Sequence, residues 1–254
     1  SLVGSGFAVA AVAAVLAACG PTVPATSCPM FPANNHWHAS VTRAPVLANS
    51  ANLITTVGAT RGLKADFGAG LWDGGPIGIP YVVVAPGPPE VDVTFEYADE
   101  SDPGGYPVPA NPPIEGGPDG AGDRHILMVE PAECRLYELY SAYPDGDGTW
   151  SAGSGAIWDL RSNAQRPLGW TSADAAGLAI LPGLVRYDEV AAGKVEHAIR
   201  MTVPLSRRTY LWQRPDWPQW RFDAAALAAP LAQVHRAQGH LAGRMAELGL
   251  AQRD

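Results

Sequence analysis

The sequence has few charged residues and no strongly basic stretch. Charged residues make up 17% of the 254 residues, and 17 lysines and arginines stand against 25 aspartates and glutamates, for a net charge of −8. A protein that binds a phosphate backbone needs clustered positive charge. We therefore expect no nucleic-acid partner, and the scarcity of charge also argues against a coiled coil and against acidic disorder.

No apolar run is long enough to cross a membrane. The longest run, residues 7–18, falls short of the roughly 20 residues that a bilayer requires, but it suits the apolar region of a secretory signal. It ends in Leu16-Ala17-Ala18-Cys19, which resembles a bacterial lipobox, where small residues precede a cysteine that becomes lipidated. We predict a lipoprotein signal over 1–18, a lipid on Cys19, and an exported protein anchored to the membrane and facing the periplasm or the cell exterior. The alternative is a plain signal peptide with an incidental cysteine.

Cysteine is also scarce, with three residues in the chain. Once Cys19 is assigned to the lipid, an oxidising compartment allows Cys28 and Cys134 a single pairing. That bridge would close a loop of about 105 residues and contribute roughly 4 to 5 kcal/mol in the chain-entropy model. The alternative is two unpaired buried thiols.

Glycine and proline are abundant, with 28 and 24 residues. They make up about a fifth of the chain, where average usage is about an eighth. Together with short apolar stretches, this favours many short strands joined by turns. Strands are predicted, in chain order, at 79–85, 91–97, 125–129, 135–140, 156–160 and 197–203. About seven strands predict a mainly β fold, an antiparallel β-sandwich or jelly roll with a few short helices.

Strand 91–97 has the clearest alternation of apolar and polar residues, and we expect it to pair antiparallel with 79–85 through the proline-rich turn at 86–89. Helical spacing predicts a helix within 45–58, capped by Asn49 or Ser50 and closed by Gly58, and single turns at 172–177 and 187–192. Residues 224–251 are rich in alanine and have one apolar face, which predicts a C-terminal helix.

Four segments follow from these patterns. We expect a lipoprotein signal peptide at 1–18, a tether at 19–33, a β-sandwich domain at 34–212 and an atypical helical tail at 213–254. The tether is rich in proline, threonine, alanine and serine, and the tail does not read as the continuation of a β domain.

Several stretches between residues 31 and 212 carry a resemblance to one family. They are Phe31-Pro32-Ala33-Asn34-Asn35, Asp66-Phe67-Gly68, Gly78-Ile79-Pro80-Tyr81, residues 99–104, Pro113-Ile114-Glu115-Gly116-Gly117, Gly122-Asp123-Arg124-His125, residues 136–140, 169–178 and 182–189. They resemble a widespread family of uncharacterised secreted bacterial proteins. The chain departs from that family at His38 and at Lys64-Ala65, and its tail replaces the C-terminal part of the family domain. The resemblance implies a secreted single domain and no particular reaction.

Acidic side chains in the loop at 99–123 are the first candidates for chemistry. Glycoside hydrolysis needs two carboxylates roughly 5 to 10 Å apart. We select Glu115, Asp123 and Asp174 as candidate catalytic residues, with the glycines after Glu115 leaving room for a substrate. The alternatives are that aspartates such as Asp99 and Asp102 cap turns, that Asp174 stabilises a helix end, or that the oxygen-rich loop binds calcium.

Histidines on strands of a jelly roll can bind a transition metal. His125 and His197 begin two predicted strands, and a third ligand would come from Glu115, Asp123, His36 or His38. The alternative is that each histidine hydrogen-bonds a backbone carbonyl and that no cofactor is present.

Aromatic residues near predicted turns suggest a surface for a sugar ring. Tyr106, Arg124 and Trp170 are the candidate substrate-binding residues, with Trp150 and Trp158 nearby in the chain. The alternative is that these aromatic residues pack in the core, and that Arg124 forms a structural ion pair with Asp123.

Three functions remain after this reading. The favoured one is an exported glycoside hydrolase or lyase that acts on cell-envelope or extracellular carbohydrate through loop carboxylates, because long loops that carry carboxylates often carry function. The alternatives are a non-catalytic surface lipoprotein that binds glycan or another envelope component, and a metal-dependent jelly-roll enzyme that uses His125 and His197.

Overall fold

The computed structural model describes residues 28–40, 42–43, 45–60, 62, 70–72 and 74–200. The predicted signal peptide, the lipidation site at Cys19, the first part of the tether and the alanine-rich tail lie outside the described residues. Within the described part, no helix is long and apolar enough to cross a membrane.

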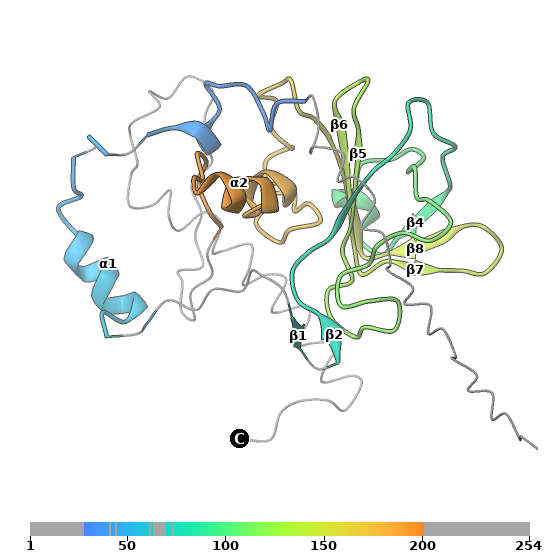
Figure 1. Ribbon diagram of the computed structural model, residues 1–254, viewed down its shortest axis with the longest axis horizontal. Helices are drawn as coiled ribbons and strands as arrows, with labels where there is room; N and C mark the ends of the chain where they lie inside the picture. Colours follow the sequence, from blue (N-terminus) through green and yellow to red (C-terminus); the bar gives the residue numbers. More distant parts are fainter. Residues whose placement is uncertain are drawn as a thin grey trace, which may run out of the picture.

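Two sheets and one small hairpin make up the strands of the described chain (Figure 1). Strands β3 (Tyr81–Val83), β5 (Ile126–Glu130), β6 (Arg135–Tyr140) and β9 (Ser154–Asp159) form a four-stranded sheet in that order. Strands β4 (Val93–Phe95), β8 (Trp150–Ala152) and β7 (Tyr143–Pro144) form a three-stranded sheet, and β1 (Leu71–Trp72) pairs with β2 (Gly75–Pro76). The fold is therefore mainly β, as predicted.

Strand β6 lies at the centre of the larger sheet. It pairs antiparallel with β5, where Glu130 opposes Arg135 at the hairpin end, and antiparallel with β9, where Leu136 opposes Trp158. Alternate residues of these strands point to opposite faces. The strand pattern read from the sequence at 125–129, 135–140 and 156–160 is confirmed within a residue or two.

One face of the four-stranded sheet packs against the three-stranded sheet. The cluster between them is buried and includes Ile126, Met128 and Leu139 from the larger sheet and Trp150 and Ala152 from the smaller one. Figure 1 shows β4, β8 and β7 on one side of β5 and β6. Two sheets that share a core in this way form the layers of a β-sandwich.

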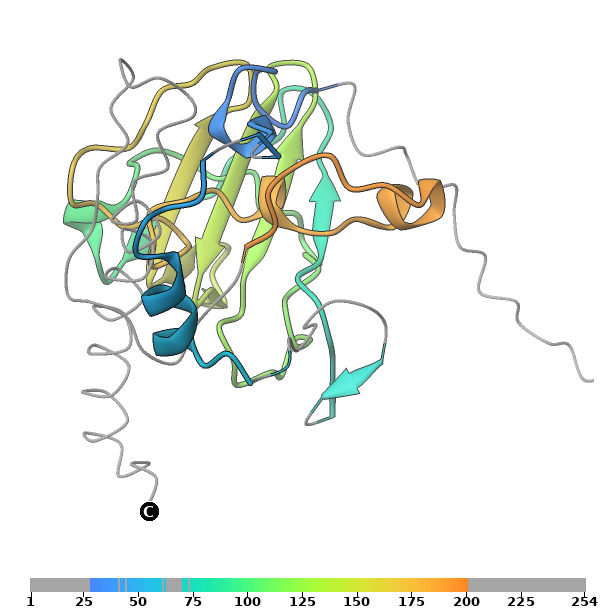
Figure 2. The same ribbon diagram turned by 90° about the vertical axis from the view of Figure 1, so that its left-hand side faces the viewer.

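The opposite face is covered by loops instead of a sheet. Leu127, Val129 and Leu136 pack there against Phe31 and Leu181, and α2 (Tyr187–Ala192) lies on the same side (Figures 1 and 2). A disulfide joins Cys28 to Cys134 in this layer, so the predicted pairing is confirmed. The last residues of the expected tether are therefore packed against the sheet.

The helices are short, as expected. Helix α1 is Ser50–Val57, preceded by Asn49 and followed by Gly58, and α2 ends at Gly193 in a left-handed conformation. The remaining helical elements are 3-10 turns: η1 (His36–His38), η2 (Ala98–Glu100) and η3 (Leu181–Gly183). The predicted helical turn at 172–177 is an irregular turn, in which the Ser172 hydroxyl accepts from the Asp174 backbone N–H at 2.9 Å.

The expected antiparallel pair of 79–85 with 91–97 is wrong. Strand β3 pairs in parallel with β5, and β4 pairs in parallel with β8 in the other sheet. The three prolines and one glycine at 86–89 therefore carry the chain from one sheet to the other instead of reversing it. Both sheets are mixed, because each combines one parallel pair with antiparallel pairing.

The loop at 99–123 packs partly into the core, because Tyr106 is fully buried, Val108 is also buried, and a bridge joins Tyr106 to Val91. One further expectation is corrected. Residues 197–200 form no strand, and residues 201–203 lie outside the described residues. Alternation alone predicted a strand at 197–203, but its described part runs alongside loops.

Candidate functional site

Glu115 and His125 form an ion pair where the long loop enters the larger sheet. The Glu115 backbone N–H donates to the carbonyl of His125 at 3.0 Å. The Glu115 carboxylate meets Nδ1 of His125 at 2.6 Å and also accepts from the His125 backbone N–H at 3.4 Å. His125 directly precedes β5, so a short bridge of backbone and side-chain contacts fixes Glu115 against the start of this strand.

The second nitrogen of His125 is also engaged. Nε2 lies 3.0 Å from the carbonyl oxygen of Ala173, and the ring lies beside that of Tyr140, with centroids 5.8 Å apart. The His125 side chain is 8% exposed, while that of Glu115 is 26% exposed. Because a carbonyl only accepts, Nε2 carries the proton in this contact, and the imidazole is held in one orientation.

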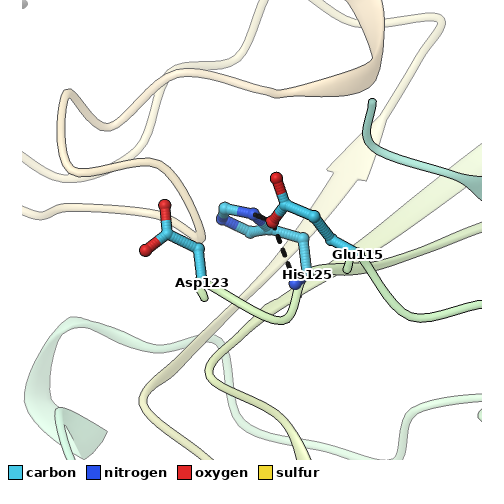
Figure 3. Close-up of side chains that lie close together, drawn as sticks. All are labelled: Glu115, Asp123 and His125. Carbon is cyan, nitrogen blue, oxygen red and sulfur yellow. Dashed lines mark hydrogen bonds and ion pairs between the residues drawn. The ribbon is translucent and has the colours of Figure 1, made fainter. Parts of the chain in front are cut away.

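Asp123 completes a group of three at this position. Glu115, Asp123 and His125 each offer one ligand atom, and these atoms all lie within 4.8 Å of one another. Figure 3 shows the His125 ring between the two carboxylates. Asp123 is exposed, whereas His125 is buried, so the group opens to solvent on the Asp123 side.

Arg124 holds the turn between Asp123 and His125. Its φ of 50° is left-handed, a conformation that is costly for a residue with a side chain. The guanidinium donates to the carbonyls of Ala142 at 3.1 Å and of Pro118 and Gly120 at 2.8 Å each. These three bonds hold the backbone in that turn, which lets Asp123 and His125 approach the same carboxylate.

Electrostatics favour the charged forms of Glu115 and His125. Burial would raise the pKa of Glu115, but the hydrogen bonds and charge of His125 outweigh it, so the pKa is lowered. Burial would likewise lower the pKa of His125, but the hydrogen bond and charge of Glu115, with the charge of Asp123, raise it. Each group thus stabilises the charged form of the other.

Asp174 lies beside this group, next to the carbonyl that His125 contacts. It is buried, and it accepts from Arg200 Nη2 at 2.6 Å. The charge of Arg200 also lowers the pKa of Glu115, although less than His125 does. Of the three predicted catalytic residues, Glu115 and Asp123 thus lie close together, whereas Asp174 forms an ion pair with Arg200.

The acidic residues at 99–102 hold the loop in place. The Asp102 carboxylate accepts from the Arg166 guanidinium and from the Ile157 backbone N–H. The Glu100 carboxylate accepts from the hydroxyl and the backbone N–H of Thr171 at 2.7 and 3.0 Å. These bonds hold the loop against β9 and the 166–171 segment. They therefore favour a structural role, and not a catalytic one, for the acidic residues at 99–102.

The predicted substrate-binding residues are not gathered around the cluster. Tyr106 has no exposed surface, and its hydroxyl donates to the carbonyl of Asp102 at 3.0 Å. Arg124 is buried, with its guanidinium 4.3 Å from the ring centre of Tyr143. Trp170 is half-buried beside Arg166, so it is the one residue of the three with surface for a ligand.

The other histidines do not join His125. The His197 ring lies 3.0 Å from the Glu189 carboxylate, and Nε2 of His38 lies 2.7 Å from the carbonyl of Met30. His36 belongs to η1, and burial lowers its pKa. In the described part of the chain, His125 forms a group of possible metal ligands with Glu115 and Asp123. His197 does not belong to that group.

Sequence reasoning missed Glu138. This residue of β6 is fully buried, and its carboxylate accepts from Trp158 Nε1 at 3.0 Å and from the backbone N–H groups of Ile180 and Leu181 at 2.9 Å each. Burial raises its pKa despite these bonds. The sequence did carry a signal for its burial, because Glu138 shares one face of a predicted strand with Leu136 and Tyr140.

Comparison with known proteins adds one match. Residues 210–254 match the model of a domain of unknown function, DUF4172. This stretch falls almost entirely within the expected atypical tail and outside the described residues. No curated protein and no solved structure matches the chain.

Proposed function

We propose that the protein is an exported, lipid-anchored β-sandwich enzyme that acts on cell-envelope or extracellular carbohydrate, as a hydrolase or a lyase. One observation carries the enzymatic part: the carboxylates of Glu115 and Asp123 converge with the His125 imidazole, with ligand atoms within 4.8 Å. Carboxylates of glycoside hydrolases lie roughly 5 to 10 Å apart. The 4.8 Å limit here falls just below that range.

The roles of the three side chains follow from their surroundings. Asp123 is exposed and is the carboxylate that a substrate meets first. The hydrogen bonds and charge of His125 lower the pKa of Glu115, so its carboxylate is suited to stabilise developing positive charge. His125 is a positioning residue, since Ala173 and Glu115 hold both of its nitrogens.

The glycines after Glu115 form a tight turn. Gly116 and Gly117 have φ of 74° and 89°, which residues with a side chain rarely adopt. A Cβ on Gly120 would meet the Gly116 carbonyl oxygen at 2.8 Å, so the loop folds tightly back on itself there. The Glu115 side chain beside this turn is 26% exposed.

Export is supported by the disulfide. The Cys28–Cys134 bridge joins residues 106 positions apart and lies in the buried layer. Disulfides of this structural kind form in oxidising compartments and are rare in the reducing cytosol. The lipid anchor rests on the sequence around Cys19. Replacing Cys19 with serine should move the protein from the membrane fraction to the soluble fraction of cells, and unchanged fractionation would contradict the anchor.

The enzymatic proposal is tested on the full chain with its disulfide formed. Purified protein is incubated with peptidoglycan and with neutral and uronate-containing polysaccharides, and new reducing ends and unsaturated products are measured. We expect turnover by the wild type and by Asp119→Asn, an exposed carboxylate of the same loop outside the cluster. Glu115→Gln should lower the rate by roughly 100-fold or more while near-UV circular dichroism stays unchanged.

Two outcomes would overturn the proposal. One is full activity of Glu115→Gln, which would place the chemistry elsewhere. The other is the absence of products from every polysaccharide although the wild type is folded. A glycan that binds without turnover, with affinity lost in Trp170→Ala, would favour the non-catalytic alternative, because Trp170 is only partly buried.

A further inference from the structure

The Glu115–Asp123–His125 cluster has the donor set of a metal site. It combines two carboxylates with one imidazole, and one atom from each lies within 4.8 Å of the others. Imidazole favours zinc, copper, iron and nickel, while carboxylates also favour manganese. We propose that this cluster binds one divalent transition-metal ion, Zn²⁺ or Mn²⁺, through Nδ1 of His125 and one oxygen each from Glu115 and Asp123.

The contacts of His125 beyond the cluster support this assignment. Histidines that bind metals usually donate their other N–H to a carbonyl or a carboxylate, which fixes the ring. Nε2 of His125 makes this contact, at 3.0 Å to the carbonyl oxygen of Ala173. The ring is buried and cannot turn away, so Nδ1 is aimed at the space beside Glu115.

Little movement is needed to admit an ion. Metal–ligand distances near 2 Å place two ligands of one ion roughly 3 Å apart. Nδ1 and the Glu115 oxygen are 2.6 Å apart, so they need to separate only slightly. Asp123 must close the remaining gap, and as an exposed side chain it is free of packing constraints. The ion takes the place of the proton between Nδ1 and Glu115, and that proton passes to the solvent.

The same donors argue against calcium. Calcium takes six to eight oxygen ligands, whereas this cluster offers a nitrogen and two carboxylates. His197, which was expected to share a metal with His125, is bound to Glu189 instead. Three protein ligands leave at least one position of the ion open to water or to a sugar oxygen, as in catalytic zinc sites.

The inference deepens the proposed function and rests on it for the role of the ion, which would polarise a sugar oxygen or activate a water molecule. Whether the ion binds does not depend on the reaction. Metal binding without turnover would refute the proposed function alone. Turnover that persists unchanged after chelation, in a protein that takes up no metal, would refute the metal site alone.

Isothermal titration of the chelator-treated full chain with ZnCl₂, MnCl₂ and CaCl₂ tests the site. We expect one Zn²⁺ or Mn²⁺ per chain, together with a higher midpoint of thermal unfolding. Asp123→Asn, an exposed position, should weaken binding by roughly tenfold or more, and the matched control Asp119→Asn should bind as the wild type does. Glu115→Gln should also weaken binding.

Three results would overturn the inference. The first is no heat and no thermal shift with either transition metal. The second is uptake that Asp123→Asn and Glu115→Gln leave unchanged, which would place the ion at other histidines. The third is binding of Ca²⁺ without Zn²⁺ or Mn²⁺, because His125 would then have no part in the site.

Discussion

Opening the Cys28–Cys134 disulfide is a perturbation whose size follows from the position of the bridge in the chain. The two cysteines are separated by 106 positions, so the bridge closes most of the described chain into one loop. In the chain-entropy model, closure of a loop of about 100 residues contributes roughly 4.7 kcal/mol to stability at 25 °C. Small domains are stable by only about 5 to 15 kcal/mol in total, so the bridge accounts for a large part of that.

Packing near the disulfide also stabilises the folded protein. Cys28 lies three positions before Phe31, whose ring meets that of Trp158 edge to face with centroids 6.1 Å apart. Without the bridge, this end of the chain keeps its place only through such contacts, which contribute about 0.5 to 1.5 kcal/mol beyond burial. Fraying of residues 28–31 would then expose the sheet face beneath them.

The assay is equilibrium unfolding in urea at pH 7, with the oxidised wild type, the reduced wild type and a Cys28→Ala/Cys134→Ala double variant. We expect the free energy of unfolding to fall by about 3 to 5 kcal/mol in both bridge-free forms. The reductant should leave the double variant unchanged. A loss below about 1 kcal/mol would refute the reasoning, because a loop of this length would then contribute almost no entropy to the unfolded chain.

Further predictions concern the buried polar groups and the tight packing of the core. Glu138→Leu should cost more than about 3 kcal/mol, because it leaves three N–H donors unpaired, and Glu138→Gln about 1 to 3 kcal/mol; urea unfolding measures both. Burial raises the pKa of Glu138 above its ordinary 4.5. As the pH rises, the unfolded chain therefore loses this proton at a lower pH than the folded protein does. The free energy of unfolding should therefore fall as the pH rises above about 4.5, and Glu138→Gln should remove that component; an equal slope in both proteins would contradict it. Tyr106→Phe should cost about 1 kcal/mol through the lost bond to Asp102, and a loss within error would show that this bond is weak. Gly155→Ala should cost about 1 to 3 kcal/mol, since its Cβ would meet the Tyr106 hydroxyl and the Phe95 ring at 2.5 and 2.6 Å, and unchanged thermal unfolding would mean that these rings move freely.

The local elements were predictable because they depend on neighbouring residues. The hairpin of β5 and β6 follows from two apolar stretches that flank the turn at 131–134, and helix α2 follows from the acidic first turn and Gly193. Alternation correctly separated the exposed from the partly buried side chains of 91–97, although it also predicted a strand at 197–203 whose described part, 197–200, forms none. These features follow from side-chain spacing, which the sequence displays directly.

Pairing between distant strands was not predictable in the same way. Strands β3 and β4 are close in sequence, yet they lie in different sheets and each has a parallel partner far along the chain. A parallel pair requires a long connection, and nothing in the local pattern of either strand specifies where that connection leads. The proline-rich turn at 86–89 was compatible with both topologies.

The candidate site shows the same division. The sequence named Glu115 and Asp123 as carboxylates of one loop and also as two of four possible third ligands for a metal on His125 and His197. It did not single out the group of Glu115, Asp123 and His125, and His197 contacts Glu189 instead. Their approach depends on the turn at Arg124, whose guanidinium reaches three backbone carbonyls.

By itself, the sequence determined the mainly β class and the shortness of the described helices, and it predicted the pairing of Cys28 with Cys134 once Cys19 was assigned to a lipid. These are matters of composition, short-range periodicity and counting. Only the tertiary structure decided which strands pair, that Tyr106 and Glu138 are buried, and that Glu115 and Asp123 meet at His125. The reason is physical: burial and close approach are set by contacts between residues far apart in the chain, and those contacts are chosen by the packing of the whole core.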